Sequence, residues 1–189
     1  MKAAVAYEAG QPLVLEDLPV PDIGPRDVLV RVTASGICHT DLHVINGLSA
    51  LPLPIIPGHE GCGIVEETGP EVRRVRAGDR VLASVTPACG TCWWCLNGMS
   101  GHCELGPVVK AALRFELKTG QRAAAVCGCG TFAEAMVVHE ASVVPVQTGL
   151  ADEQLALLGC GVTTGLGAAL NTRATANQGP PARDRTSWP

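Results

Sequence analysis

Short apolar stretches separated by glycine and proline run through most of the chain. Runs rich in β-branched residues predict strands at residues 2–7, 13–17, 28–32, 62–68, 79–85, 131–139 and 143–146. Many short strands joined by glycine- and proline-containing turns indicate a mainly β fold with short helices, in the form of a partly open β-barrel.

Helical segments are few and short in this pattern. We expect helices from Cys38 to about Ile45, from Ala151 through Gln154 and over Val162 to Leu170. The second of these has acidic residues in its first turn, which suits the helix dipole. Residues 86–106 look irregular and rich in cysteine, and residues 107–130 show no clear period.

The end of the chain differs in character from what precedes it. From Arg173 to Pro189 a Pro-Pro pair and three arginines occur without the period of a helix or a strand. We therefore expect an atypical, disordered tail over residues 173–189.

Composition excludes several classes of function. Of 189 residues, 47% are apolar and 17% are charged, which is typical of a globular chain with a core. The net charge is −4 and no basic block occurs, so a nucleic-acid partner is not expected. No apolar run is long enough to span a bilayer, and Glu8 comes too early for a signal peptide.

Nine cysteines are many for such a chain, and an odd number cannot all pair in internal disulfides. In a reducing compartment cysteines more often bind metal or line the core. We therefore expect a cytoplasmic protein without a membrane partner.

Four of the cysteines form a tight pattern. They are spaced C-x2-C-x2-C-x7-C and comprise Cys89, Cys92, Cys95 and Cys103. Four thiolates this close can complete a tetrahedral shell around Zn²⁺ and leave no open position, so the predicted site is structural. The alternatives are a reduced, metal-free loop and a redox cluster.

A second candidate site draws on three distant segments. His59 lies in Gly58-His59-Glu60-Gly61-Cys62-Gly63, between a proline-rich loop and a β-branched run, while Cys38 lies upstream and Cys160 downstream. One histidine and two cysteines would give Zn²⁺ three protein ligands and leave the fourth position open, as in catalytic zinc sites. Each residue alone is more often only part of a core.

Together these motifs resemble the zinc-dependent medium-chain alcohol dehydrogenase family. The resemblance runs from Met1 to about Thr172 and includes Gly58-His59-Glu60, Gly63, Gly69 and Val72. It implies a GroES-like catalytic domain over 1–155 with a zinc lobe at 86–106, and the start of a linker to a cofactor domain at 156–172. It also implies two zinc sites, an alcohol or aldehyde substrate, NAD(P) as the hydride partner, and a homo-oligomer in the intact family.

The resemblance assigns roles to further residues. Asp41 orients the histidine ligand, as a carboxylate commonly does for a metal-bound histidine. Thr40 and His43 carry a proton relay through the cofactor ribose, and His39 touches the cofactor pyrophosphate. Glu60 swings toward the metal during ligand exchange, or instead forms a local salt bridge. Thr40 as a helix cap and His43 as a surface residue remain the alternative.

One expected unit is missing from the 189 residues. A dinucleotide-binding domain needs a strand, G-x-G-x-x-G and a helix, and the glycines of Gly159-Cys160-Gly161-Val162-Thr163-Thr164-Gly165 have another spacing and no preceding apolar strand. We therefore expect the catalytic domain only, inactive alone, as after a frameshift or truncation near codon 173.

Two other functions stay open. The first alternative is a non-catalytic zinc-binding remnant or interaction module. The second is a thiol-redox protein that uses Cys127 and Cys129, although small residues packed near a strand explain this pair as well.

Overall fold

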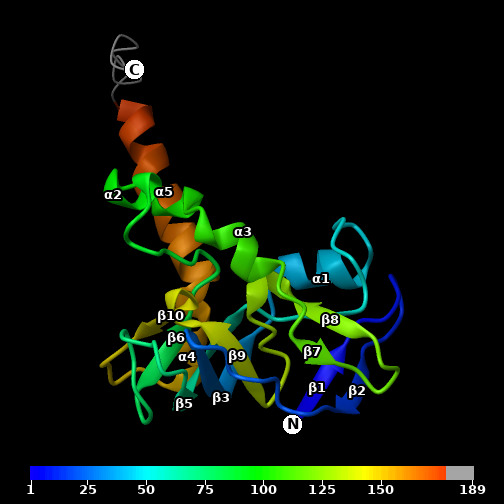
Figure 1. Ribbon diagram of the computed structural model, residues 1–189. Coiled ribbons are helices and arrows are strands. Elements are labelled where there is room, and N and C mark those ends of the chain that lie inside the picture. The colour runs from blue at the N-terminus through cyan, green and yellow to red at the C-terminus, as the bar shows by residue number, and fades with distance from the viewer. Residues whose placement is uncertain (178–189) are drawn as a thin grey trace.

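A five-stranded antiparallel sheet forms the centre of the molecule, in the order β10-β6-β5-β3-β9 (Figure 1). The computed structural model describes residues 1–177. The strands of this sheet are β3 (Asp27–Gly36), β5 (Glu60–Thr68), β6 (Arg80–Ala83), β9 (Ala135–His139) and β10 (Val143–Pro145). Alternate residues of β3, such as Val28 and Val30, are fully buried and contact Val65, Val81 and Met136 in the core.

Two smaller sheets complete a partly open barrel. β1 (Lys2–Val5) pairs with β2 (Val14–Asp17), and β4 (Ile55–Ile56) pairs with β8 (Arg122–Ala125), which also pairs with β7 (Phe115–Glu116). A single bridge between Ala3 and Ala133 joins β1 to the segment before β9, and another between Ala6 and Ile55 joins the end of β1 to β4. The predicted mainly β fold with short helices is confirmed.

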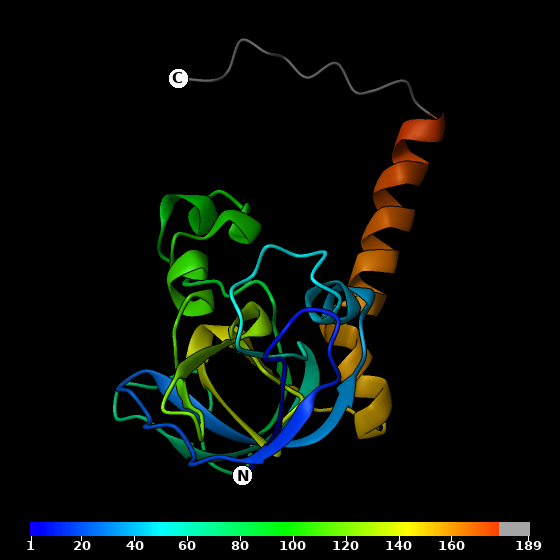
Figure 2. The ribbon, with the colours of Figure 1, turned by 90° about the vertical axis from the view of Figure 1, so that its right-hand side faces the viewer.

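The helices lie outside the sheets and are mostly short. They are α1 (His39–Ile45), α2 (Trp93–Leu96), α3 (Leu105–Lys110), α4 (Asp152–Ala156) and α5 (Gly161–Asn177), with 3-10 turns η1 (Ser100–His102), η2 (Val126–Gly128), η3 (Glu140–Ser142) and η4 (Leu157–Gly159). Figure 2 shows α5 extending away from the sheets on one side, while α2 and α3 rise on the other. Within residues 1–177 no helix is both long and apolar enough to cross a membrane.

Several element boundaries differ from those expected. The helix expected over residues 162–170 continues to Asn177 and so includes the first residues of the expected disordered tail. Alanine is frequent there, and a high helix propensity extends a helix without an apolar period. The remainder of that tail, residues 178–189, lies outside the described residues.

Other elements were missed because they are too short to show a period. The irregular segment contains α2, η1 and the start of α3, while β7 and β8 lie in the stretch without a clear pattern. The strand expected over 131–139 begins only at Ala135. Two-residue strands such as β4 and β7 depend on tertiary pairing rather than on local sequence.

A buried carboxylate joins the end of β9 to the connection between β5 and β6. Glu140 is 1% exposed, and its Oε1 accepts hydrogen bonds from Arg26 Nε at 2.9 Å and Nη2 at 2.6 Å. Its Oε2 accepts from the backbone N–H groups of Arg73 at 2.8 Å and Arg74 at 3.1 Å. Burial acts to raise the pKa of Glu140, but these donors outweigh it and lower the pKa below its usual value.

The lowered pKa gives a pH-dependent contribution to stability. A carboxylate with a depressed folded-state pKa stabilises the fold above the unfolded-state pKa, and this contribution disappears as the pH falls through the folded-state value. We expect Glu140→Gln to lower the free energy of unfolding at pH 7 by about 2 kcal/mol, in the range for hydrogen bonds to a charged group. Below about pH 4 the difference from the wild type should shrink.

Chemical denaturation of the metal-free proteins at both pH values measures this difference. Glu116→Gln is the matched control, because Glu116 is exposed. An equal loss of stability at both pH values would contradict the assignment to an ionised Glu140.

Candidate metal centres

Asp41 fixes the relative positions of two of the predicted ligands. It is fully buried as the third residue of α1, which begins directly after Cys38. Its Oδ2 accepts a hydrogen bond from the Cys38 N–H at 3.1 Å, and its Oδ1 accepts from the Gly58 N–H at 2.9 Å and lies 3.1 Å from His59 Nδ1. Because Nδ1 donates to Asp41, the other ring nitrogen, Nε2, is left as the lone-pair donor for a metal.

The backbone before His59 requires glycine. Gly58 has a φ of +92°, and a Cβ there would come within 2.5 Å of Thr131 Oγ1 and Phe132 Cδ1. Larger residues would therefore displace the loop that delivers His59 to the start of β5. The predicted loop-to-strand junction is where the structure places this histidine.

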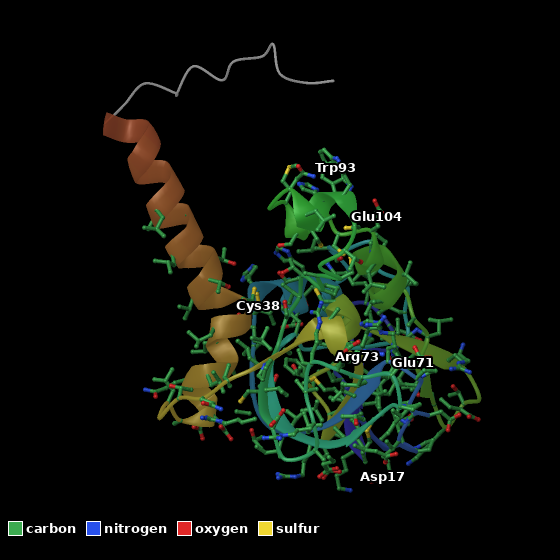
Figure 3. The ribbon with its side chains drawn as sticks, turned by 60° about the vertical axis from the view of Figure 1, so that its left-hand side comes forward. Asp17, Cys38, Glu71, Arg73, Trp93 and Glu104 are labelled. Atoms are coloured by element: carbon green, nitrogen blue, oxygen red, sulfur yellow. The ribbon has the colours of Figure 1, made fainter. Side chains whose placement is uncertain are left out.

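Cys160 reaches the same place from the other end of the chain. It lies between η4 and α5, and the ligand atoms of Cys38, His59, Glu60 and Cys160 all lie within 4.8 Å of one another. Figure 3 shows Cys38 beside the base of α5. Three segments that are far apart in sequence thus converge on one point.

Glu60 contributes a buried carboxylate to this group. It is 3% exposed, and its Oε1 accepts a hydrogen bond from the Gly161 N–H at 2.9 Å. Among residues 1–170, whose side chains the structure describes, no ion pair involves Glu60, so the alternative of a local salt bridge is not seen there. Instead, Glu60 connects the start of β5 to the residue that follows Cys160.

The three ligands strongly influence one another's protonation. Burial acts to raise the pKa of Cys38, but hydrogen bonds from the backbone and hydroxyl of Thr40 and from His59 lower it below its usual value. Burial acts to lower the pKa of His59, but Asp41 and Cys38 raise it above its usual value. Burial and the nearby Cys38 raise the pKa of Cys160 to about 11, since two thiolates repel each other. A divalent cation would remove this repulsion, so the donor set fits zinc.

The other residues singled out on α1 lie around this group. Thr40 lies near enough to the Cys38 sulfur to lower the pKa of this thiol, a proximity that the spacing of the two residues did not predict. The side chains of His39, Thr40 and His43 are exposed. The rings of His39 and His43 contact each other edge to face, with centroids 4.6 Å apart.

The second group consists of the four cysteines of residues 86–106. The Sγ atoms of Cys89, Cys92, Cys95 and Cys103 all lie within 4.8 Å of one another. The Cys89–Cys95 and Cys92–Cys103 sulfur pairs are each 3.9 Å apart. A tetrahedral zinc with Zn–S bonds of about 2.3 Å places its sulfur ligands about 3.8 Å apart, so the spacing fits this ion.

Polar groups around these sulfurs favour some thiolates and oppose others. Hydrogen bonds from the Thr91 hydroxyl and backbone and from the Cys92 N–H lower the pKa of Cys89 to about 5. The Gly90 N–H acts to lower the pKa of Cys95, but desolvation and the neighbouring thiols raise it to about 12. Without a cation, four negative charges cannot be held at this spacing.

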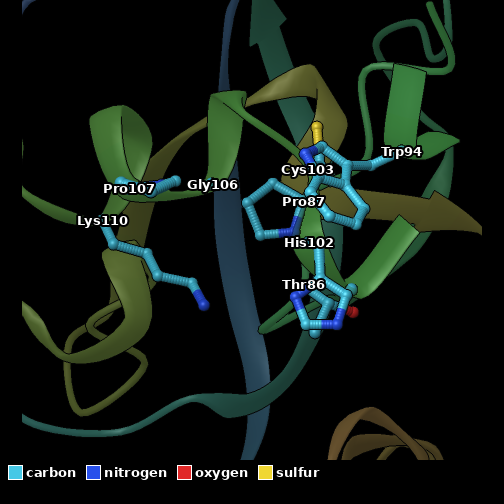
Figure 4. A pocket seen from close by; sticks show the side chains of 9 residues that line it. Thr86, Pro87, Trp94, His102, Cys103, Gly106, Pro107 and Lys110 are labelled. Atoms are coloured by element: carbon cyan, nitrogen blue, oxygen red, sulfur yellow. The ribbon is translucent and has the colours of Figure 1, made fainter. Parts of the chain in front are cut away.

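A surface hollow of about 390 Å³ lies against the four-cysteine lobe (Figure 4). Its lining includes Trp94, His102, Cys103 and Lys110, and none of Cys38, His59 or Cys160. The Trp94 and His102 rings pack together with centroids 5.2 Å apart. The hollow therefore belongs to the lobe rather than to the group formed by Cys38, His59 and Cys160.

Cys127 and Cys129 lack the surroundings of reactive thiols. Burial raises the pKa of both, to about 12 for Cys129, which lies in the main core. Cys62 is also fully buried, and its thiol donates to the Asp152 carbonyl at 3.2 Å. Buried thiols with raised pKa values are typically structural, so the environment favours packing over redox chemistry.

Some supporting residues were not found from the sequence. Arg80 donates to the Asp152 carboxylate and to the carbonyls of Thr148, at 3.1 Å, and Leu150, at 2.7 Å. These contacts attach α4, and with it the segment that leads to Cys160, to β6. No motif marks such an arginine, because its partners lie about 70 residues away.

A comparison with known protein families identifies the family to which this fold belongs. The alcohol dehydrogenase GroES-like domain family matches residues 24–148. The chain belongs to this family. The match covers the main sheet, Cys38, His59 and the four-cysteine lobe.

Curated relatives of the chain are alcohol dehydrogenases. It is 43% identical over 175 residues to putative alcohol dehydrogenase D of Mycobacterium tuberculosis, covering 89% of this chain and 47% of the relative. It is 41% identical to the NDMA-dependent alcohol dehydrogenase of Amycolatopsis methanolica, again covering 89% of this chain and 47% of the relative. The chain thus spans about half the length of the curated relatives it matches.

Solved structures give the same result. An alcohol dehydrogenase zinc-binding domain protein from Burkholderia ambifaria superposes with a TM-score of 0.78 at 35% identity, covering 92% of this chain and 49% of that one. Benzyl alcohol dehydrogenase from Acinetobacter calcoaceticus has a TM-score of 0.78 at 33% identity, covering 90% of this chain and 47% of that one. The GroES-like fold is therefore confirmed.

Asp41→Asn tests the carboxylate that joins Cys38 to His59. An amide cannot accept all three hydrogen bonds, so we expect zinc affinity at this group to fall about 10- to 100-fold, as for other residues that orient a ligating histidine. Isothermal titration of the metal-free chain with zinc measures the change. The exposed Asp22 provides the control Asp22→Asn, and an unchanged affinity in Asp41→Asn would contradict the role.

Cys92→Ala and His59→Ala separate the two groups. We expect Cys92→Ala to lose one zinc ion per chain and to melt at a markedly lower temperature, since a small lobe depends on its ion for folding. His59→Ala should lose the other ion and leave the fold largely intact. Elemental analysis and thermal melting measure both effects, and unchanged zinc content and melting in Cys92→Ala would overturn the lobe assignment.

Proposed function

We propose that the chain is the catalytic domain of a zinc-dependent alcohol dehydrogenase, acting between an alcohol or aldehyde and NAD(P). In this proposal residues 1–155 form the catalytic domain, residues 86–106 its zinc lobe, and residues 156–172 the start of a linker to a cofactor domain. The convergence of Cys38, His59 and Cys160 in front of Asp41 carries the proposal. Family membership and relatives that are alcohol dehydrogenases support it.

Cys38, His59 and Cys160 would hold a catalytic zinc with one position open to substrate. When bound there, zinc would polarise the alcohol oxygen and lower its pKa. The four cysteines of the lobe would hold a second, structural zinc with no open position. Glu60, buried beside the three ligands, is placed to approach the metal position when a ligand leaves.

Residues of α1 would move the proton. The Thr40 hydroxyl acts to lower the pKa of the Cys38 thiol, so it lies near this predicted ligand, and Thr40 is exposed; it would accept the proton of an alcohol in the open position. His43, which is three residues further on and also exposed, can pass a proton to solvent. His39 on the same exposed side would contact the cofactor pyrophosphate.

A non-catalytic zinc-binding module is the second candidate. It is favoured by the lack of a strand followed by G-x-G-x-x-G in the 189 residues. Such a module would hold its metal ions for structure alone and would not open a coordination position to an alcohol.

An alcohol-binding measurement distinguishes a catalytic zinc site from a non-catalytic zinc-binding module. With Co²⁺ in place of Zn²⁺, we expect 2,2,2-trifluoroethanol to shift the visible d–d absorption of the wild type, because the alcohol enters the metal's coordination shell. His59→Ala should show no such shift. A wild type without any shift would favour the non-catalytic module.

Hydride transfer is tested separately. We expect no alcohol-dependent formation of NADH by the isolated chain, since no dinucleotide fingerprint occurs in it. Turnover by the wild type, absent in His59→Ala, would overturn the non-catalytic alternative outright.

A further inference from the structure

Arg74 connects the four-cysteine lobe to the body of the protein. Its Nη2 donates to the carbonyl of Ala88 at 2.6 Å and to the carbonyl of Cys89 at 3.1 Å. Cys89 is the first of the four cysteines and begins the loop that carries the others. A single guanidinium therefore holds the backbone at the entrance to the lobe.

The backbone of Arg74 is itself fixed. Its N–H donates to Glu140 Oε2 at 3.1 Å, alongside the N–H of Arg73 at 2.8 Å. Glu140 is buried and is also bound by Arg26. The hydrogen bonds thus run without a break from the buried carboxylate of Glu140 through Arg74 to Cys89.

The position of the Cys89 backbone determines where its sulfur lies. Cys89 Sγ accepts from the Thr91 N–H at 3.3 Å and from the Cys92 N–H at 3.2 Å. These donors belong to the turn that starts at the carbonyl held by Arg74. A shift of this carbonyl would move the sulfur and its donors away from the other three cysteines.

Charge favours an arginine at this place. Four thiolates and one divalent cation leave two excess negative charges, and little of the lobe compensates them. Arg74 Nη2 lies 3.8 Å from the position that a Cβ on Gly90 would take, so the cation lies against the cysteine turn itself. Arg73, which is also exposed, makes no side-chain hydrogen bond or ion pair with residues 1–170, the part of the chain whose side chains the structure describes.

We infer that Arg74 is a positioning residue for the four-cysteine metal site, coupling metal retention in the lobe to the Glu140 anchor in the core. This inference rests on the proposed zinc-binding role of the lobe. Arg74 does not touch the metal. It acts by fixing the Cys89 carbonyl and by placing a cation beside the thiolates.

Arg74→Ala tests the inference in the zinc-loaded full chain. The proteins are exposed to EDTA and iodoacetamide, digested with trypsin and analysed by mass spectrometry. The peptide of residues 81–110 contains all four lobe cysteines and no others. We expect its alkylation to be about tenfold faster in Arg74→Ala, because loss of such outer contacts commonly weakens metal binding by 10–100-fold.

Two internal controls make the result specific. Arg73→Ala removes a neighbouring exposed arginine and should be alkylated at the wild-type rate. The peptides that contain Cys38 and Cys160 should react at unchanged rates in Arg74→Ala, whereas a general loss of stability would accelerate them too. Figure 3 shows the position of Arg73 relative to Trp93 of the lobe.

The outcomes are distinct. Wild-type alkylation of peptide 81–110 in Arg74→Ala, or equal acceleration of every cysteine peptide, would overturn the positioning role alone. If zinc does not protect peptide 81–110 in the wild type, the lobe is not a zinc site, and both this inference and that part of the proposed function fail.

Discussion

The Asp41 carboxylate is the constraint on which the candidate catalytic centre depends. Because it binds the N–H groups of Cys38 and Gly58 and the ring of His59, it joins the start of α1 to the start of β5. The pairing of β3 with β5, in which Gly36 lies opposite Glu60, already brings the two segments together, and each segment carries one predicted ligand. An unpaired buried carboxylate would be costly, so the fold that satisfies Asp41 also assembles the ligands. Only Cys160 reaches the centre independently, and the Glu60–Gly161 contact holds it there.

Repulsion between thiolates governs the rest of both centres. Desolvation raises the pKa values of Cys160 and Cys95, and each also lies beside another thiol, which raises the pKa further. A bound cation converts this repulsion into attraction, which is why such centres couple metal binding to folding. The two groups differ in what surrounds them. Cys38 and its partners lie by the exposed residues of α1, whereas the lobe sulfurs are enclosed by their own turn.

Much of this arrangement could be predicted from the sequence, because clustered cysteine and histidine residues have few common roles other than metal binding. The four lobe cysteines lie close together in the sequence, so their motif can be recognised without knowledge of the fold. The convergence of Cys38, His59 and Cys160 is not local, and only the resemblance to a family brought them together. Whether those residues act in catalysis stays a prediction.

The roles of Arg74 and Arg80 could not be predicted, because long-range contacts to carbonyl groups leave no pattern in a sequence. The extent of α5 was misjudged because its alanines favour a helix without giving it an apolar face.

The two centres share a physical design despite their different chemistry. Each depends on a buried acid that binds backbone N–H groups from a separate segment: Asp41 behind the three-ligand group, and Glu140 behind the lobe. A carboxylate suits this task, because it accepts several hydrogen bonds in fixed directions and its burial is tolerated only when all of them form. Hydrogen bonds to such buried carboxylates position the predicted metal ligands before an ion binds. The difference lies in distance: Asp41 contacts a ligand directly, while Glu140 acts through the length of an arginine side chain. Direct contact with a buried acid would keep three ligands fixed around an open coordination position. A site with four cysteine ligands and no open position would instead gain most of its rigidity from its own metal–sulfur bonds.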